Sequence, residues 1–210
     1  MAMLIPRPPP GAAGCAEYEI RPRERRSFNN VLDASLALDR LGRRSVARID
    51  VTADEVVLAI DHPLARGRIR DDVRLAITAD GLRTQLPDGA YPELALPFLA
   101  GWLPLARERV SLLAYISDRF VVRMYVEPTG TRKTREVVMY PDLNDWVQLG
   151  PALSRLARPL YRMAYELAPP HRLVRFEGPY GPPGSPEIVL ELSRHFASAG
   201  DESPAASARV

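Results

Sequence analysis

The amino-acid sequence predicts an α+β fold with an antiparallel sheet of about six to seven strands built from hairpins. An N-terminal helix, a short middle helix and a long helix after the last main strand are expected to accompany the sheet. Runs rich in β-branched and aromatic residues, joined by tight turns, predict the sheet. Apolar residues spaced by three or four between Leu153 and Leu167 predict the long helix.

The clearest hairpin spans two adjacent runs, VSLLAYIS (110–117) and FVVRMYVE (120–127). Both runs are strand-like in composition, and the dipeptide between them suits a tight turn. Because side chains alternate along a strand, the second run has two different faces. One face consists of Phe120, Val122, Met124 and Val126, and the other of Val121, Arg123, Tyr125 and Glu127. We therefore expect an apolar face against the core and a mixed face towards solvent or a partner.

A basic loop, EPTGTRKT, follows this hairpin and leads to a third strand at 135–140. Pro141 ends that strand because proline lacks the N–H that a β-ladder needs. Asp142 is a good N-cap for the long helix, which is expected at 143–167 with a disturbance at its Gly-Pro pair. Such a helix would cover the apolar face of the strands.

The first half of the chain predicts a helix followed by two hairpins. Ser27 can cap a helix that reaches Leu41, and Gly42 suits its C-terminal end. The first hairpin is predicted to pair strands at 46–51 and 55–60. The second pairs strands at 73–79 and 82–86 around the strong Asp-Gly turn signal at 80–81. The apolar stretch 91–106, interrupted by prolines and a glycine, predicts a short, irregular helix.

The two ends of the chain are expected to lack fixed structure. Residues 1–26 form a Pro/Arg-rich arm, and residues 198–210 are small and polar, so both are predicted to be flexible. Residues 27–197 are predicted to form a single domain, whose last elements are a strand at 174–177 and a helix at 186–197.

The order of these elements resembles that of type III secretion chaperones and related peptide-binding proteins. The resemblance covers roughly residues 27–167 and rests on element order alone. It implies a small α+β dimer that binds a peptide.

The composition indicates a soluble protein of a reducing compartment. Hydrophobic residues make up 46% of the 210-residue chain, enough for one buried core, while a formal net charge of +2 argues against a dedicated nucleic-acid binder. Lys133 is the only lysine, a bias typical of a GC-rich bacterial genome. Cys15 is the only cysteine, so an intrachain disulfide and a thiolate zinc site are excluded. No apolar run approaches the ~20 residues that span a bilayer. We therefore expect a cytoplasmic protein that binds no metal, cofactor or membrane.

One surface is the candidate binding site. It combines the outer face of the 110–127 hairpin with the basic loop, and its residues are Tyr115, Arg123, Tyr125, Arg132, Lys133 and Arg135. An aromatic and cationic sheet face can stack bases or hold an extended peptide, and a loop with hydroxyls and cations can hold phosphate. However, GTRKT lacks the glycine and the strand-to-helix context of a phosphate loop. A solvated loop and an ordinary half-polar sheet face are the alternatives.

Other polar residues support weaker hypotheses. The residues of a site dispersed in sequence would be Asp61, His62, His171 and His195, since no compact catalytic motif is present. Five arginines could bind an acidic partner: Arg155, Arg158, Arg162, Arg172 and Arg175. The first three form a stripe on the predicted long helix, and the alternative is that this stripe is the solvated side of the helix.

The preferred interpretation is a non-enzymatic, chaperone-like adaptor for a protein or peptide, with a homodimer as an option. The alternatives are an enzyme with a dispersed site and a phosphate- or nucleic-acid-binding protein that uses the basic turn at 129–135. Nucleic acid is the less favoured partner because the net charge is small.

Overall fold

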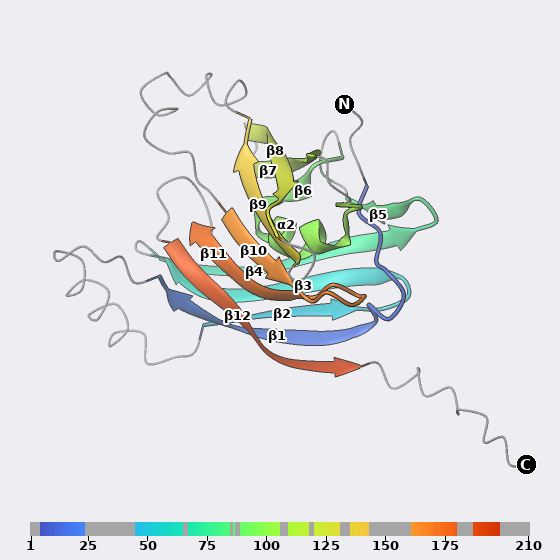
Figure 1. Cartoon of the computed structure of the whole chain (residues 1–210). Coiled ribbons are helices and arrows are strands. Elements are labelled where there is room, and N and C mark those ends of the chain that lie inside the picture. Colours follow the sequence, from blue (N-terminus) through green and yellow to red (C-terminus); the bar gives the residue numbers. More distant parts are fainter. Residues whose placement is uncertain are drawn as a thin grey trace, which may run out of the picture.

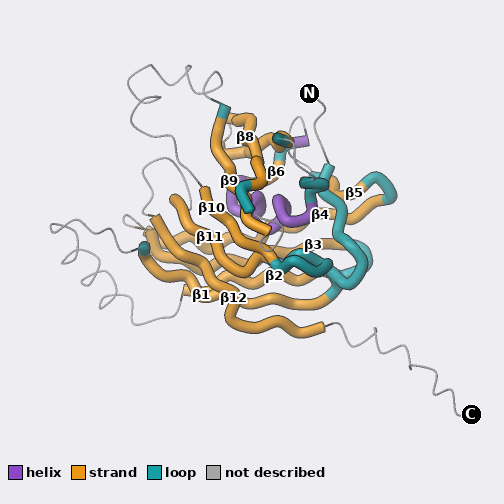
Figure 2. Tube along the Cα trace, viewed as in Figure 1, coloured by secondary structure: helices purple, strands orange, loops and turns teal. Residues whose placement is uncertain are grey.

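A computed structural model shows a mostly β protein (Figures 1 and 2). The residues that it describes are 5–23, 45–64, 67–84, 86, 89–105, 109–117, 120–130, 135–142, 161–179 and 187–197. Within these residues twelve strands form one mixed sheet, accompanied by a single short helical segment.

The strands of the sheet alternate with short turns along most of the chain. In chain order they are β1 (Gly14–Pro22), β2 (Ser45–Val51), β3 (Glu55–Leu64), β4 (Gly67–Thr78), β5 (Gly81–Arg83), β6 (Tyr91–Pro92), β7 (Val110–Ser117), β8 (Phe120–Pro128), β9 (Arg135–Pro141), β10 (Tyr161–Tyr165), β11 (Leu173–Pro179) and β12 (Glu187–Ala197). The helical segment between β6 and β7 consists of η2 (Glu93–Ala95), α2 (Leu96–Leu99) and η3 (Ala100–Trp102).

The sheet consists of two antiparallel meanders that flank β1. The strand order is β5-β4-β3-β2-β1-β12-β11-β10-β9-β8-β7-β6, so β1 lies between the first meander and the last strand. Figure 1 shows β1 in blue beside β12 in red. The exception to the antiparallel pattern is β6, which pairs in parallel with β7. The two ends of the described chain therefore meet in the middle of the sheet.

The helical segment lies inside the curve of the sheet and forms the centre of the core (Figure 2). Leu96, Phe98 and Leu99 are buried there. The ring of Tyr18 on β1 meets Phe98 edge-on, with 5.2 Å between the ring centroids, and the Tyr165 hydroxyl on β10 donates to the Pro97 carbonyl. The central strand β1 and the second meander thus both pack on one short helix.

Period-two alternation explains why β1 and β12 form half-buried strands. In β12, Ile188 and Leu190 are buried and Leu192 packs against the core. On the opposite face Val189 is also buried, whereas Glu191 is partly exposed and Ser193 is exposed. In β1, Ala16, Tyr18 and Ile20 are buried in the same way. Each strand therefore presents one apolar face to the helical segment, as expected for a half-buried strand.

The predicted α+β class is wrong, because two segments predicted as helix are strands. The helix predicted at 186–197 is β12, and the end of the long helix predicted at 143–167 is β10, paired with β9 and β11. Residues 143–160 lie outside the described residues, as does the predicted helix from Ser27 to Leu41. The resemblance to type III secretion chaperones loses its basis, since it depended on that element order.

Within the arm expected at 1–26, residues Gly14–Pro22 form β1. Further towards the N-terminus, the Pro6 carbonyl accepts a hydrogen bond from the Leu82 N–H at 2.9 Å, and the Arg7 side chain donates to the Asp80 carbonyl at 3.2 Å. Residues 6–22 therefore belong to the folded body. No helix among the described residues is both long and apolar enough to span a bilayer.

Candidate functional site

The structure places Tyr115, Arg123 and Tyr125 on one face of the β7–β8 hairpin, opposite the core. Arg123 lies across from Leu113 in the register, and Tyr125 lies across from Ser111. The intervening residues Val122, Met124 and Val126 are buried, as predicted. Binding by this face stays a prediction.

Tyr125 on this face already has interactions with its neighbours. Its hydroxyl donates to Asp142 Oδ2 at 2.7 Å, its ring lies 5.8 Å from the Tyr140 ring, and the Arg109 guanidinium lies 4.3 Å above its centroid. The Tyr140 hydroxyl in turn donates to Glu127. A ligand on this face would have to compete with these contacts.

Arg135 does not share that face, because its side chain turns inward. Its Nη2 donates to the carbonyls of Gly101 at 3.0 Å and Leu103 at 3.1 Å, so it holds the C-terminal end of η3 against β9. Burial lowers the pKa of this guanidinium, and its Nε has no hydrogen-bond partner among the described residues. Arg132 and Lys133 lie outside the described residues.

The residues considered for a dispersed catalytic site are not gathered by the fold. Asp61 belongs to β3 and His195 to β12, which are separated by β2 and β1. His171 occupies the β10–β11 turn, where its Nδ1 lies 3.0 Å from the Glu166 carbonyl, and the side chain of His62 lies outside the described part. Within that part, no three His, Cys, Asp or Glu side chains are grouped so that they could hold a metal ion.

Arg162, predicted as part of an arginine stripe on a helix, lies on a strand instead. Arg162 is exposed on β10, Arg172 pairs with Glu166 at 3.1 Å in the β10–β11 turn, and Arg175 on β11 pairs with Glu177 at 2.6 Å. These arginines therefore lie on different elements, with different partners. Arg155 and Arg158 lie outside the described residues.

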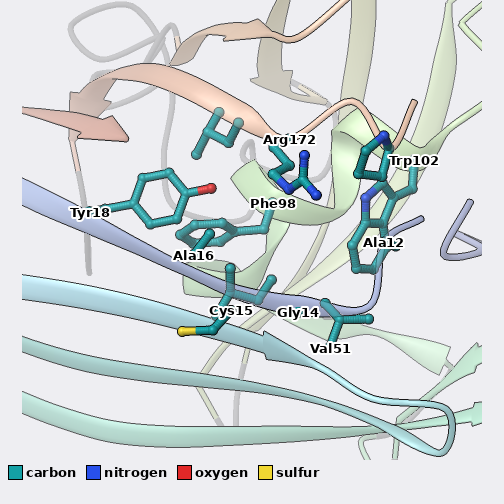
Figure 3. Close-up of a pocket in the computed structure, with 12 residues that line it drawn as sticks. Ala12, Gly14, Cys15, Ala16, Tyr18, Val51, Phe98, Trp102 and Arg172 are labelled. Carbon is teal, nitrogen blue, oxygen red and sulfur yellow. The ribbon is translucent and has the colours of Figure 1, made fainter. Parts of the chain in front are cut away.

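A small hollow opens between the start of β1, the helical segment and the β10–β11 turn (Figure 3). It offers about 30 Å³ to the centres of water molecules, which is room for about two of them. Tyr18, Phe98, Trp102 and Arg172 line it. Tyr18 is 1% exposed, and its hydroxyl has no hydrogen-bond partner among the described residues. The hollow suits bound water rather than an organic substrate.

Cys15 borders this hollow, but its thiol points away from it in Figure 3. Burial and a hydrogen bond with Asp50 on β2 raise the pKa of the thiol to about 11. The thiolate is the reactive form of cysteine. Cys15 is therefore protonated at neutral pH, the less reactive form of a thiol.

A carboxyl group with a raised pKa lies inside the curve of the sheet. The Tyr161 hydroxyl on β10 donates to Glu93 Oε1 on η2 at 3.0 Å. Burial raises the pKa of Glu93 to about 7, although the hydrogen bond from Tyr161 acts in the opposite direction. Such pKa values occur in catalytic acids, and here the carboxyl group accepts its hydrogen bond from the Tyr161 side chain. We interpret the pair as part of the core.

The most distinctive site is the place where β12 separates from β11. Pairing of β12 with β1 runs from Ile188 to Ala197, whereas its pairing with β11 stops at Glu191. Among the described residues, 192–197 therefore have a neighbouring strand on one side only. We call this region, Leu192–Ala197 on β12, the fork. Figure 1 shows the end of β12 running on past β11.

A β-bulge accounts for the fork. Tyr18 pairs with Leu192 but Glu17 pairs with Arg194, so Ser193 is an extra residue on β12. A bulge bends its strand and increases the local twist. On the other side, β11 begins only at Leu173, after the turn that contains His171 at a φ of 56°. Both strands therefore diverge at this point.

The fork carries one exposed apolar side chain, Phe196, which is 52% exposed. The other large apolar side chains that are exposed in the described part of the chain are Ile5, Leu167 in the β10–β11 turn and Val174 on β11. Phe196 therefore offers an apolar contact beside the edge of β12.

Sequence reasoning missed the fork because it predicted β12 as a helix. The alternation of Ile188, Leu190 and Leu192 was the available signal, and it indicates a strand. Comparison with known proteins does not assign the site: no protein-family model matches the chain, and no curated protein matches it.

Proposed function

We propose that this is a non-enzymatic adaptor that binds an extended segment of a partner protein, which joins the sheet as an additional strand at the fork. The observation that carries the proposal is the unpaired edge of β12 from Leu192 to Ala197. We further propose that it acts in the cytoplasm, because its single cysteine requires no oxidising compartment.

An unpaired strand edge has free hydrogen-bonding groups along its backbone. In an antiparallel ladder, alternate residues direct their N–H and C=O groups to one side, so about half of the groups in 192–197 face away from β1. Proteins usually protect such edges with prolines, inward charges or covering loops. Among the described residues, the edge carries the exposed side chain of Phe196. Addition of a strand would satisfy the backbone groups and give the Phe196 ring an apolar neighbour.

The rest of the described structure supports a binding role over catalysis. The hollow beside Tyr18 has room for about two waters, and Asp61, His171 and His195 lie on separate elements. A binding edge needs no such convergence of polar groups.

The test uses twelve-residue peptides selected from a displayed random library against the full chain. Each selected peptide is then synthesised in two N-methylated forms, with the methyl groups on alternate residues of one edge or of the other. One form should lose binding and the other should keep it, because a strand pairs through one edge at a time.

Amide hydrogen exchange of the protein locates the bound peptide. We expect slower exchange at alternate residues within 193–197 when the peptide is added, and unchanged exchange in β8, whose backbone is paired on both sides. Equal binding of both N-methylated forms, or protection elsewhere than in 192–197, would refute strand addition at the fork.

A further inference from the structure

We propose, on the basis of the function proposed above, that the fork selects a segment with an acidic residue and an apolar residue separated by one position. The acidic residue would lie next to Arg194 and the apolar residue next to Phe196. Both residues of this pattern would project from the outer face of the added strand.

Arg194 is a cation without a partner in the described structure. Its side chain is exposed and forms no ion pair with a described residue. Other arginines of the same outer surface are paired: Arg48 with Asp50 at 2.9 Å, and Arg21 and Arg175 both with Glu191. Glu17, which lies across from Arg194 in the register, is instead 3.8 Å from Arg48. Arg194 is thus available to an incoming carboxylate.

Arg194 and Phe196 lie on the same face of β12. Their partners across the β1 ladder are Glu17 and Cys15, which alternate with the buried Ala16. A strand added to the free edge has the same two-residue period, so two of its side chains lie beside Arg194 and Phe196. This period predicts the spacing of the recognised residues.

A second copy of this chain is a poorer occupant than an acidic segment. Two β12 edges paired antiparallel about Arg194 would place the two Arg194 side chains directly opposite each other. Like charges across a ladder are destabilising. The charge of the edge therefore favours a partner with carboxylates.

The experiment compares three designed ten-residue peptides of alternating threonine and valine. The first contains a central Glu-Thr-Val, the second replaces its glutamate by lysine, and the third replaces the apolar residue by serine. Binding to the full chain is measured by fluorescence anisotropy. We expect the first peptide to bind roughly three- to tenfold more tightly than the second, the range of a cross-strand charge pair and its reversal.

The Arg194→Glu variant supplies the decisive comparison. It should invert the preference, so that the lysine peptide binds more tightly than the glutamate peptide. Arg162→Glu is the matched control, since Arg162 is also exposed and lies on β10 away from the fork. It should leave the preference unchanged. Phe196→Ser should remove the advantage of valine over serine while the preference for glutamate persists.

The outcomes separate this inference from the proposed function. Equal affinities of the glutamate and lysine peptides, with slowed amide exchange at 193–197, would overturn the charge pattern and leave strand addition standing. An inversion in Arg162→Glu as well as in Arg194→Glu would assign the preference to overall charge and overturn the inference. Absence of binding by all three peptides would overturn it too, and a concentration-dependent dimer that protects 193–197 would assign the edge to a second copy.

Discussion

Replacement of Glu93 by glutamine should change the pH dependence of stability. Glutamine has nearly the same shape as glutamate and can accept the hydrogen bond from Tyr161, but it carries no charge. The pKa of Glu93 is raised from 4.5 to about 7 by burial in the folded protein. Tyr161, whose pKa is raised well above 10, stays neutral throughout this range.

The sign of the effect follows from proton linkage. Between pH 4.5 and 7 the folded state retains a proton on Glu93 that the unfolded chain has lost, so the free energy of unfolding falls as pH rises through this window. Above pH 7 the full cost of the buried charge applies. A raised pKa of this size corresponds to at most about 3 kcal/mol. The wild-type protein should therefore lose stability relative to Glu93→Gln between pH 4.5 and 8.

Urea unfolding at pH 4.5, 6 and 8 measures this difference. We expect similar free energies of unfolding for both proteins at pH 4.5 and a more stable Glu93→Gln variant at pH 8. The control is Glu136→Gln, because Glu136 is exposed on β9. Parallel pH profiles of the wild type and Glu93→Gln would refute the reasoning that the carboxyl group is buried against Tyr161.

Three further predictions concern the core and the basic loop. Gly101→Ala should lower stability by roughly 1–3 kcal/mol in urea unfolding, because the added methyl would lie 2.6 Å from the Tyr165 ring; an unchanged unfolding midpoint would contradict this packing. Arg135→Gln should lower the free energy of unfolding by about 1–3 kcal/mol in the same measurement, because the carbonyls of Gly101 and Leu103 lose their hydrogen-bond donor. Arg162→Gln, on the exposed side of β10, should have little effect. Reversal of Arg132-Lys133 to glutamate should leave the melting temperature nearly unchanged and weaken binding of an acidic or phosphorylated partner to the outer face of β8. If the double variant bound this partner as tightly as the wild type does at both low and high salt, the loop would have no part in binding.

Local features of the sequence predicted the local parts of the fold. The β7–β8 hairpin follows from two strand-like runs and the short turn between them, and its buried face follows from alternation. The short middle helix is present as Glu93–Trp102, where Pro92 precedes the first turn. Each of these predictions depends on residues that are near one another in the chain.

The features that the sequence did not predict depend on distant residues. In β12, Ile188, Leu192 and His195 fit a helical spacing, while Ile188, Leu190 and Leu192 fit a strand equally well. Pairing with β1, at the opposite end of the chain, decides for the strand. The fork could not be predicted either, because it depends on the registers of β12 with both β1 and β11. The inward turn of Arg135 likewise depends on carbonyls of η3, more than thirty residues away.

The pairing of the first strand with the last has a consequence for the order of folding. The pair from Gly14 to Ala197 spans 183 positions of the chain, and contacts of such separation form slowly because a long loop must first be closed. During synthesis β12 follows all other described strands, so the edges of β1 and β11 that pair with β12 stay unpaired until it is made. Nascent chains stalled before residue 187 should therefore associate with chaperones and aggregate more readily than the finished chain.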